Sequence, residues 1–112
     1  MKQITWDEFQ NVELRVGTII DVQDFPEARI PAYKITADFW ADIGIKKSSA
    51  QITVLYTKEE LLNKQILGVV NFPVKQIWPF YSEFLVTGFV NWNWEVILAV
   101  PDKKSINWTK LW

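Results

Sequence analysis

Short segments of alternating apolar and polar residues make up most of this chain, and one strong helix start interrupts them. Alternation is clear over residues 12–22 and 33–37, and residues 43–52 contain a third strand-like segment. A capping box then begins at Thr57, whose hydroxyl can accept from a backbone amide while Glu60 bonds back. The remaining strand-like segments are residues 65–72, 83–89 and 95–100. Such a chain must build its core mainly from strands.

The order of these segments predicts an all-β domain. Three strands, one helix and then further strands is the chain order of a five-stranded OB-fold, a small Greek-key barrel that a helix can plug at one end. A second short helix is expected at residues 6–10, after a capping Thr5. We expect a bend or bulge near Gly17. An SH3-like barrel or a small sandwich is the alternative, and residues 1–112 are expected to form one domain.

The residue types that most enzymes use are missing. The chain has no cysteine and no histidine, which excludes disulfides, thiolate metal sites, cysteine nucleophiles and histidine-based triads. A carboxylate-only hydrolase and an oxygen-ligand ion site stay open, but there is no glycine-rich phosphate loop. We therefore expect a protein that is not an enzyme and uses no cofactor.

Charge is unevenly distributed along the chain. Residues 1–42 carry a net charge of −4 and residues 43–112 a net charge of +3, so the total is −1. A near-neutral domain has no strong long-range field to attract nucleic acid. Any RNA binding should come from a local patch and should weaken with salt.

No segment looks suited to a membrane. The longest apolar stretches, such as residues 66–70, are too short to span a bilayer, and the first residues turn acidic where a signal peptide needs an apolar run. We expect a cytoplasmic protein with no membrane insertion.

Residues 46–53 combine two cations, three hydroxyls and an amide. These donors suit phosphate or peptide backbone. On a strand, odd-numbered and even-numbered residues face opposite sides, so one ligand contacts all of them only at a bulge or loop. In the alternative interpretation the lysines are solvated and a serine bonds neighbouring backbone. The candidate contacts are Lys46, Lys47, Ser48, Ser49 and Gln51.

The run from Lys47 to Thr53, taken with residues 71–73, is the most specific of the stretches by which this sequence resembles the CsaA family of secretion-chaperone-like proteins. The matching stretches cover nearly the whole chain in order and are residues 25–29, 31–34, 38–39, 43–53, 56–57, 69–73, 76–77, 79–80, 82–83, 85–86 and 101–102. The family belongs to the tRNA-binding-domain group, which includes modules of methionyl- and phenylalanyl-tRNA synthetases. The resemblance implies an OB-fold homodimer that binds unfolded or preprotein segments and the export motor SecA. It also implies RNA binding, including tRNA, as the wider trait of the group.

A second candidate segment begins at Asn71. It resembles the part of tRNA-binding domains that carries an asparagine and basic residues toward nucleic acid, and this chain has fewer cations there than those proteins do. Asn71 can instead bond local backbone at a strand end. The positions taken as peptide or RNA contacts are Asn71, Phe72, Lys75 and Ser82.

Apolar residues and prolines fill the same segment. Exposed apolar surface of this kind marks a binding or subunit interface. We assign Pro73, Ile77, Pro79 and Phe80 to a dimer interface, with peptide contact as a secondary role. Arg29 and Tyr33 flank the first long loop and could stack on a base or clamp a peptide, although Arg29 is as readily a solvated loop charge.

Seven tryptophans are unusually many for 112 residues. Four of them (Trp40, Trp78, Trp94 and Trp108) stand where the CsaA family would place glycine. Turns that take glycine often need positive φ, which costs a bulky residue about 1–2 kcal/mol. We interpret these four, with Trp92 and Trp112, as substitutions that strain turns and make the surface adhesive, and not as a stacking platform.

These observations favour a homodimeric, non-enzymatic chaperone that holds extended polypeptide and binds RNA weakly on an overlapping face. A stand-alone tRNA-binding protein acting in trans is the alternative, and a purely structural dimer is a third class. A continuous basic stripe would favour the tRNA-binding protein.

Overall fold

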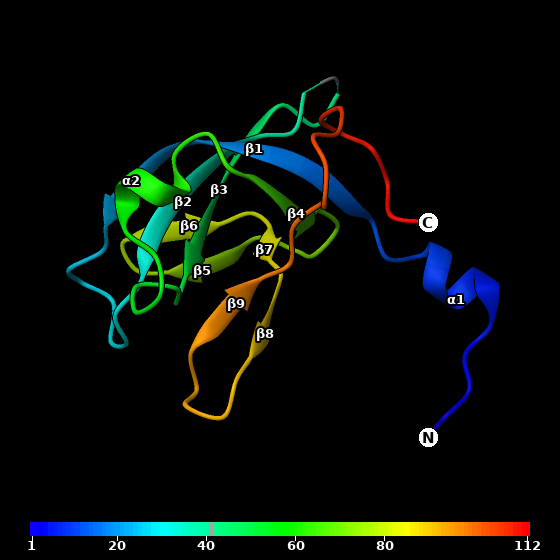
Figure 1. Ribbon diagram of the computed structural model, residues 1–112, viewed down its shortest axis with the longest axis horizontal. Coiled ribbons are helices and arrows are strands. Elements are labelled where there is room, and N and C mark those ends of the chain that lie inside the picture. Colours follow the sequence, from blue (N-terminus) through cyan, green and yellow to red (C-terminus); the bar gives the residue numbers. More distant parts are fainter. Residues whose placement is uncertain (41) are drawn as a thin grey trace.

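A five-stranded antiparallel sheet forms the centre of the fold (Figure 1) in the computed structural model, which describes residues 1–40 and 42–112. In spatial order its strands are β3 (Ile45–Ala50), β2 (Tyr33–Asp38), β1 (Leu14–Asp24), β4 (Gln65–Val69) and β7 (Leu85–Val86). The second half of β1 pairs with β2, and its first half pairs with β4. This long shared strand curls the sheet into a nearly closed barrel, which confirms the expected OB-fold.

Two hairpins complete the strands. One joins β5 (Lys75–Ile77) to β6 (Phe80–Ser82), and the other joins β8 (Gly88–Val90) to β9 (Val96–Leu98). The single strand expected over residues 83–89 is therefore wrong. It is divided at Thr87, whose amide and hydroxyl both donate to the Leu67 carbonyl oxygen. In Figure 1 the β8–β9 hairpin projects from the barrel.

Both predicted capping boxes are present. Thr5 begins α1 (Trp6–Gln10), and Thr57 begins α2 (Lys58–Leu61). The two helices differ in burial, because α2 inserts Leu61 completely into the core while α1 buries no residue. Within the described part of the chain, neither helix has the length or apolar character needed to cross a bilayer.

The irregularity in β1 lies beyond the expected position. Pairing with β2 shifts register between Ile19 and Asp21, whereas Gly17 pairs regularly with Ile66 of β4. Gly17 serves packing instead, because a Cβ atom there would lie 2.7 Å from Cε1 of Phe39. A bare backbone at this point lets the Phe39 ring lie against the sheet.

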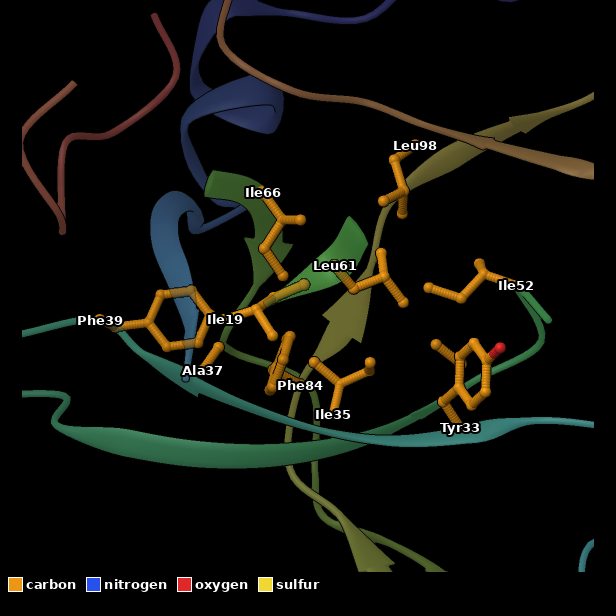
Figure 2. Packing of buried hydrophobic residues seen from close by; sticks show 11 residues of the cluster. Ile19, Tyr33, Ile35, Ala37, Phe39, Ile52, Leu61, Ile66, Phe84 and Leu98 are labelled. Atoms are coloured by element: carbon orange, nitrogen blue, oxygen red, sulfur yellow. The ribbon is translucent and has the colours of Figure 1, made fainter. Parts of the chain in front are cut away.

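The core lies inside the curled sheet, under α2. Phe39 meets Phe84 edge to face, with ring centroids 5.0 Å apart. Figure 2 shows the side chains that converge there from β1, β2, β4 and α2. The cluster comprises Ile19, Tyr33, Ile35, Ala37, Phe39, Ala50, Ile52, Leu61, Ile66, Phe84 and Leu98.

Three tryptophans do occupy left-handed backbone. The φ angles are 62° at Trp40, 62° at Trp94 and 79° at Trp108, so the strain expected at the last two turns is confirmed. Trp78 is not in this group. Trp108 also has a contact that the sequence did not suggest, because the Arg15 guanidinium lies 3.9 Å from its ring centroid.

Candidate functional site

A pocket of about 440 Å³ opens where the barrel is not closed, between β3, the β5–β6 hairpin and β7. Its lining combines apolar side chains from the core edge with a polar set from β3 and β6. The lining residues are Ser48, Ser49, Ala50, Gln51, Ile52, Phe72, Pro73, Lys75, Ile77, Ser82, Phe84, Leu85, Val86 and Val96.

The floor of the pocket is apolar and continuous with the core. Ile52 and Phe84 belong to the buried cluster, and Val86 and Val96 pack against that cluster. Ile77 adds a half-buried aliphatic side chain from the β5–β6 hairpin. A floor of this chemistry suits an aliphatic or aromatic side chain rather than a charged group.

Three serines form the inner polar wall. Ser48 is only 1% exposed, and its hydroxyl lies 3.3 Å from the Ser82 hydroxyl and donates to the Ser49 carbonyl oxygen. The Ser49 amide donates to the Ser82 hydroxyl over 3.4 Å. Ser48 therefore matches the alternative interpretation, in which a serine bonds neighbouring backbone. These contacts fix β6 against β3 and set the width of the pocket.

The outer rim carries the groups that remain free for a ligand. Gln51 and Lys75 are exposed, and within the described residues neither side chain forms a hydrogen bond or ion pair. Phe72 is exposed beside them. The rim thus offers an amide, an ammonium group and an aromatic face above the apolar floor.

The two lysines that precede the serines lie outside this lining. Lys47 is held through its backbone, because its amide donates to Glu83 Oε1 over 3.0 Å and its carbonyl accepts from the Glu83 amide. Its side chain is exposed, and that of Lys46 is half-buried. Of the five candidates in residues 46–53, three therefore line the pocket, namely Ser48, Ser49 and Gln51. The two lysines do not.

Arg29 and Tyr33 do not come together at a ligand surface. Tyr33 is buried in the core, where its hydroxyl donates to the Tyr56 carbonyl oxygen over 2.9 Å. Its ring is thus not free to stack on a base. Arg29 is exposed in the loop before β2, away from the residues that line the pocket.

Asn71 bonds backbone on the N-terminal side of β1. Its Oδ1 accepts from the Glu13 amide over 3.1 Å, and its Nδ2 donates to the Asn11 carbonyl oxygen over 2.7 Å. Both ends of the amide are used. This arrangement matches the alternative in which Asn71 is a strand-end asparagine that orders local backbone.

The four residues assigned to a dimer interface also separate. Pro73 and Ile77 line the pocket, and Pro79 is exposed at the turn of the β5–β6 hairpin. Phe80 packs within the chain, with its ring centroid 5.5 Å from that of Phe25. The Lys34 ammonium lies over both rings, 4.9 Å from the Phe25 centroid and 5.7 Å from the Phe80 centroid.

Sequence reasoning did not identify most of the apolar residues that line the pocket. The missed residues are Ala50, Ile52, Phe84, Leu85, Val86 and Val96. Their apolar character and alternation mark them as strand residues of a core, which most of them are. No local pattern indicates that a gap between β3 and β7 leaves part of this core open to solvent.

One solved structure decides the family. The CsaA chaperone protein from Picrophilus torridus is 48% identical to this chain, with a TM-score of 0.89, and the match covers 97% of this chain and 99% of that one. The chain belongs to the CsaA family. A CsaA chaperone from Bacillus anthracis is 41% identical over 98% of this chain and 99% of that one, with a TM-score of 0.90. The resemblance stated from the sequence is thus confirmed.

More distant relatives connect the CsaA family to aminoacyl-tRNA synthetases. The methionine–tRNA ligase of Pyrococcus furiosus is 30% identical in an alignment of 109 residues that covers 93% of this chain but 14% of the ligase. This chain thus spans about one seventh of the curated relatives' length. A MetRS related protein from Pyrococcus horikoshii shares the fold, with a TM-score of 0.86 at 20% identity. No family model matches the chain.

Proposed function

We propose that this CsaA-family protein is a non-enzymatic chaperone that binds unfolded or preprotein segments in the pocket between β3 and the β5–β6 hairpin. One observation carries the proposal, namely an apolar floor beneath a rim of unpaired polar groups. An extended peptide has the complementary surface, with apolar side chains on one face and backbone amides along its length. The proposal uses no nucleotide and no bond-forming step.

Each part of the pocket would have a separate task. The floor around Val86 and Ile77 would take one apolar side chain of the peptide, with a gain of about 1.5–3 kcal/mol for full burial. Gln51 and Lys75 would bond the peptide backbone or an acidic side chain at the rim. Because the floor accepts any apolar group of suitable size, binding should tolerate many sequences.

A pair of matched variants tests this mode. Ile77→Ser removes an apolar side chain from the floor, whereas Ile45→Ser makes the same change at an exposed position on β3 outside the pocket. Affinity for a reduced, carboxymethylated and permanently unfolded protein is measured by isothermal titration calorimetry. We expect Ile77→Ser to weaken binding about tenfold and Ile45→Ser to leave it unchanged. Equal affinities for both variants and the wild type would rule out the pocket.

We propose that two copies act together as a homodimer, which the CsaA resemblance implies. Exposed apolar surface for a second copy lies on α1 and the β8–β9 hairpin as well as on residues 73–80, where Val74 and Trp78 are exposed, and we place the interface on α1 and the hairpin. The strand β8 is exposed along its whole length, whereas β9 buries Leu98 in the core, so the free apolar surface of this hairpin lies mainly on β8. The exposed side chains include Trp6, Phe89, Val90 and Ile97.

Solution mass at micromolar concentration tests the dimer. Phe89→Glu would place a carboxylate in this surface and should give a monomer, whereas Phe72→Glu at the pocket rim should remain a dimer. If the Phe72→Glu variant dissociates and the Phe89→Glu variant does not, the interface lies at the pocket as first expected.

A second function, binding of tRNA in trans, draws support from the similarity to methionine–tRNA ligases. Titrations across a range of salt concentrations separate the two functions. Steep loss of tRNA affinity with salt indicates several phosphate contacts, while peptide binding to an apolar floor should respond little.

The proposed setting is the cytoplasm, with the export motor SecA as the protein partner implied by the resemblance. Purified SecA and a labelled preprotein segment provide the test. The chaperone role in export predicts that this protein binds SecA directly and hands over the segment. Failure to bind SecA would leave peptide binding intact and remove only the link to export.

A further inference from the structure

A second groove lies on another part of the barrel. It has a volume of about 790 Å³. Its lining includes Thr18 of β1, residues 63–65 at the start of β4 and residues 100–107. It shares no lining residue with the peptide pocket. In Figure 1 this C-terminal segment leads from β9 to the side of the barrel away from β5 and β6, and Trp40 lines the groove together with it.

Lysines dominate the charge of this groove. Lys64, Lys103 and Lys104 line it, and Asp102 is the single carboxylate among the lining residues. Within the described part of the chain, none of the three ammonium groups forms an ion pair or a hydrogen bond. The groove is therefore a local positive patch on a chain whose net charge is −1.

The segment that carries two of the lysines is fixed to the barrel. The Gln65 side chain holds Ser105 at both backbone groups, donating to its carbonyl oxygen over 2.6 Å and accepting from its amide over 2.8 Å. The Thr18 hydroxyl donates to Asn107 Oδ1 over 2.8 Å. Because the backbone beside the lysines is already ordered, a ligand would lose less free energy to ordering this surface.

The free donors fit phosphates along a chain better than a single anion. The cations come from two segments of the chain, Lys64 from just before β4 and Lys103 and Lys104 from the C-terminal segment, and Asn63 and Ser105 belong to the same lining. Trp40 adds an exposed indole at one wall, on which a base could stack. An acidic peptide is the competing ligand for the lysines, and the stacking surface of Trp40 favours RNA over it.

We propose that this groove binds the phosphate backbone of RNA, so that RNA and polypeptide occupy separate surfaces of the protein. This proposal differs from the expectation that RNA and polypeptide share one overlapping face. The inference names a location for the tRNA binding raised above and is independent of peptide binding at the pocket.

The experiment compares two double variants that remove the same charge. Lys103→Ala/Lys104→Ala acts at the groove, and Lys46→Ala/Lys47→Ala removes another adjacent pair, on β3 outside it. The probe is bulk tRNA, titrated by filter binding between 50 and 200 mM salt, and binding of the carboxymethylated unfolded protein is measured in parallel. Thermal melts confirm that each variant is folded.

The groove variant should weaken tRNA binding about tenfold and reduce the slope of log affinity against log salt by about 2. Its affinity for the unfolded protein should stay at the wild-type value. Trp40→Gly should also weaken tRNA binding, by a smaller factor than the double variant, because phosphate contacts outweigh stacking on one indole. Loss of tRNA binding in the β3 variant alone would place RNA on the overlapping face and overturn the inference.

Two further outcomes would also overturn it. If wild-type protein binds no tRNA at 50 mM salt, neither the groove nor the tRNA function stands, while peptide binding is unaffected. If polyglutamate binds through Lys103 and Lys104 more tightly than tRNA, the groove is a site for acidic polypeptide.

Discussion

Lys110 and Glu13 join the two ends of the chain, with Nζ of the lysine donating to Oε2 of the glutamate over 2.9 Å. The other oxygen, Oε1, accepts from Nη2 of Arg15 over 2.7 Å. Around this pair, residues 108–111 run along the first part of β1 and exchange backbone hydrogen bonds with it. The carboxylate therefore holds the C-terminal segment, which leads back to the basic groove.

Stability should depend on the protonation of Glu13. The hydrogen bonds from Lys110 and then Arg15 hold the pKa of this carboxyl below its ordinary value of 4.5. Because the folded pKa is depressed, the contribution is complete above about pH 4.5 and is lost as pH falls through the folded pKa. We expect Glu13→Gln to lower the free energy of unfolding by about 1 kcal/mol at pH 7 and by much less at pH 3. Urea denaturation at both values measures this.

Glu27→Gln serves as the control for that prediction, because Glu27 is exposed and forms no ion pair in the described structure. It should match the wild type at both pH values. If Glu13→Gln lowers the free energy of unfolding as much at pH 3 as at pH 7, the variant has lost packing and not a charge interaction.

Trp94 should be replaceable by glycine with a gain in stability. Its φ of 62° is strained for a residue with a side chain, and its indole is 86% exposed, so little packing is lost. We expect Trp94→Gly to raise the free energy of unfolding by about 1 kcal/mol. Trp92 lies in the same turn, is fully exposed and is not among the positive-φ residues, so Trp92→Gly should give no gain. Equal shifts in melting temperature for the two variants would argue against backbone strain.

The two capping boxes should differ in their effect on stability. Thr57→Ala removes the cap of α2, which buries Leu61, and should cost about 1 kcal/mol of global stability. Thr5→Ala removes an identical cap from α1, which buries no residue of its own, and should only fray that helix. Urea denaturation of each variant at low protein concentration, where the proposed homodimer would dissociate, checks this. A global loss in Thr5→Ala there would show that α1 is part of the cooperative unit.

Gly17 should tolerate no side chain while Phe39 is present. A Cβ atom would lie 2.7 Å and 2.8 Å from two ring carbons of Phe39, which is too close without a shift. We expect Gly17→Ala to cost about 1–3 kcal/mol. In a Phe39→Leu background the same change should cost clearly less, and a double-mutant cycle measures that coupling. Additive effects would mean that the strain lies elsewhere.

Local patterns in the sequence were sufficient for much of the architecture. The alternation at residues 33–37 and the capping boxes at Thr5 and Thr57 predicted β2 and both helix starts, because these depend on neighbours within a few residues. The bulge was expected near Gly17 but lies between Ile19 and Asp21. A glycine in a strand indicates either a bulge or a close approach of another residue to the backbone, and at Gly17 it is the close approach of Phe39. Only the position of Phe39, 22 residues away, distinguishes the two.

The candidate site was predicted in part. Ser48 and Ser49 on β3, Gln51 directly after β3 and Ser82 on β6 do meet at one pocket. Tyr33 was expected at a ligand surface and lies in the core, because its hydroxyl finds a buried backbone partner that no local pattern reveals. The apolar floor could not be predicted for the same reason. A residue such as Val86 is equally hydrophobic whether its strand is covered by a neighbouring strand or borders an open pocket.

The amino-acid sequence by itself determined the class of fold and the helix caps, because these follow from periodicity and from residues close together along the chain, and its resemblance to known proteins indicated the family. Tertiary structure alone decided where the barrel stays open and that Lys64 joins Lys103 and Lys104 at one groove. The physical reason is that strand pairing joins residues far apart in the chain, and only the completed sheet shows which surfaces remain uncovered.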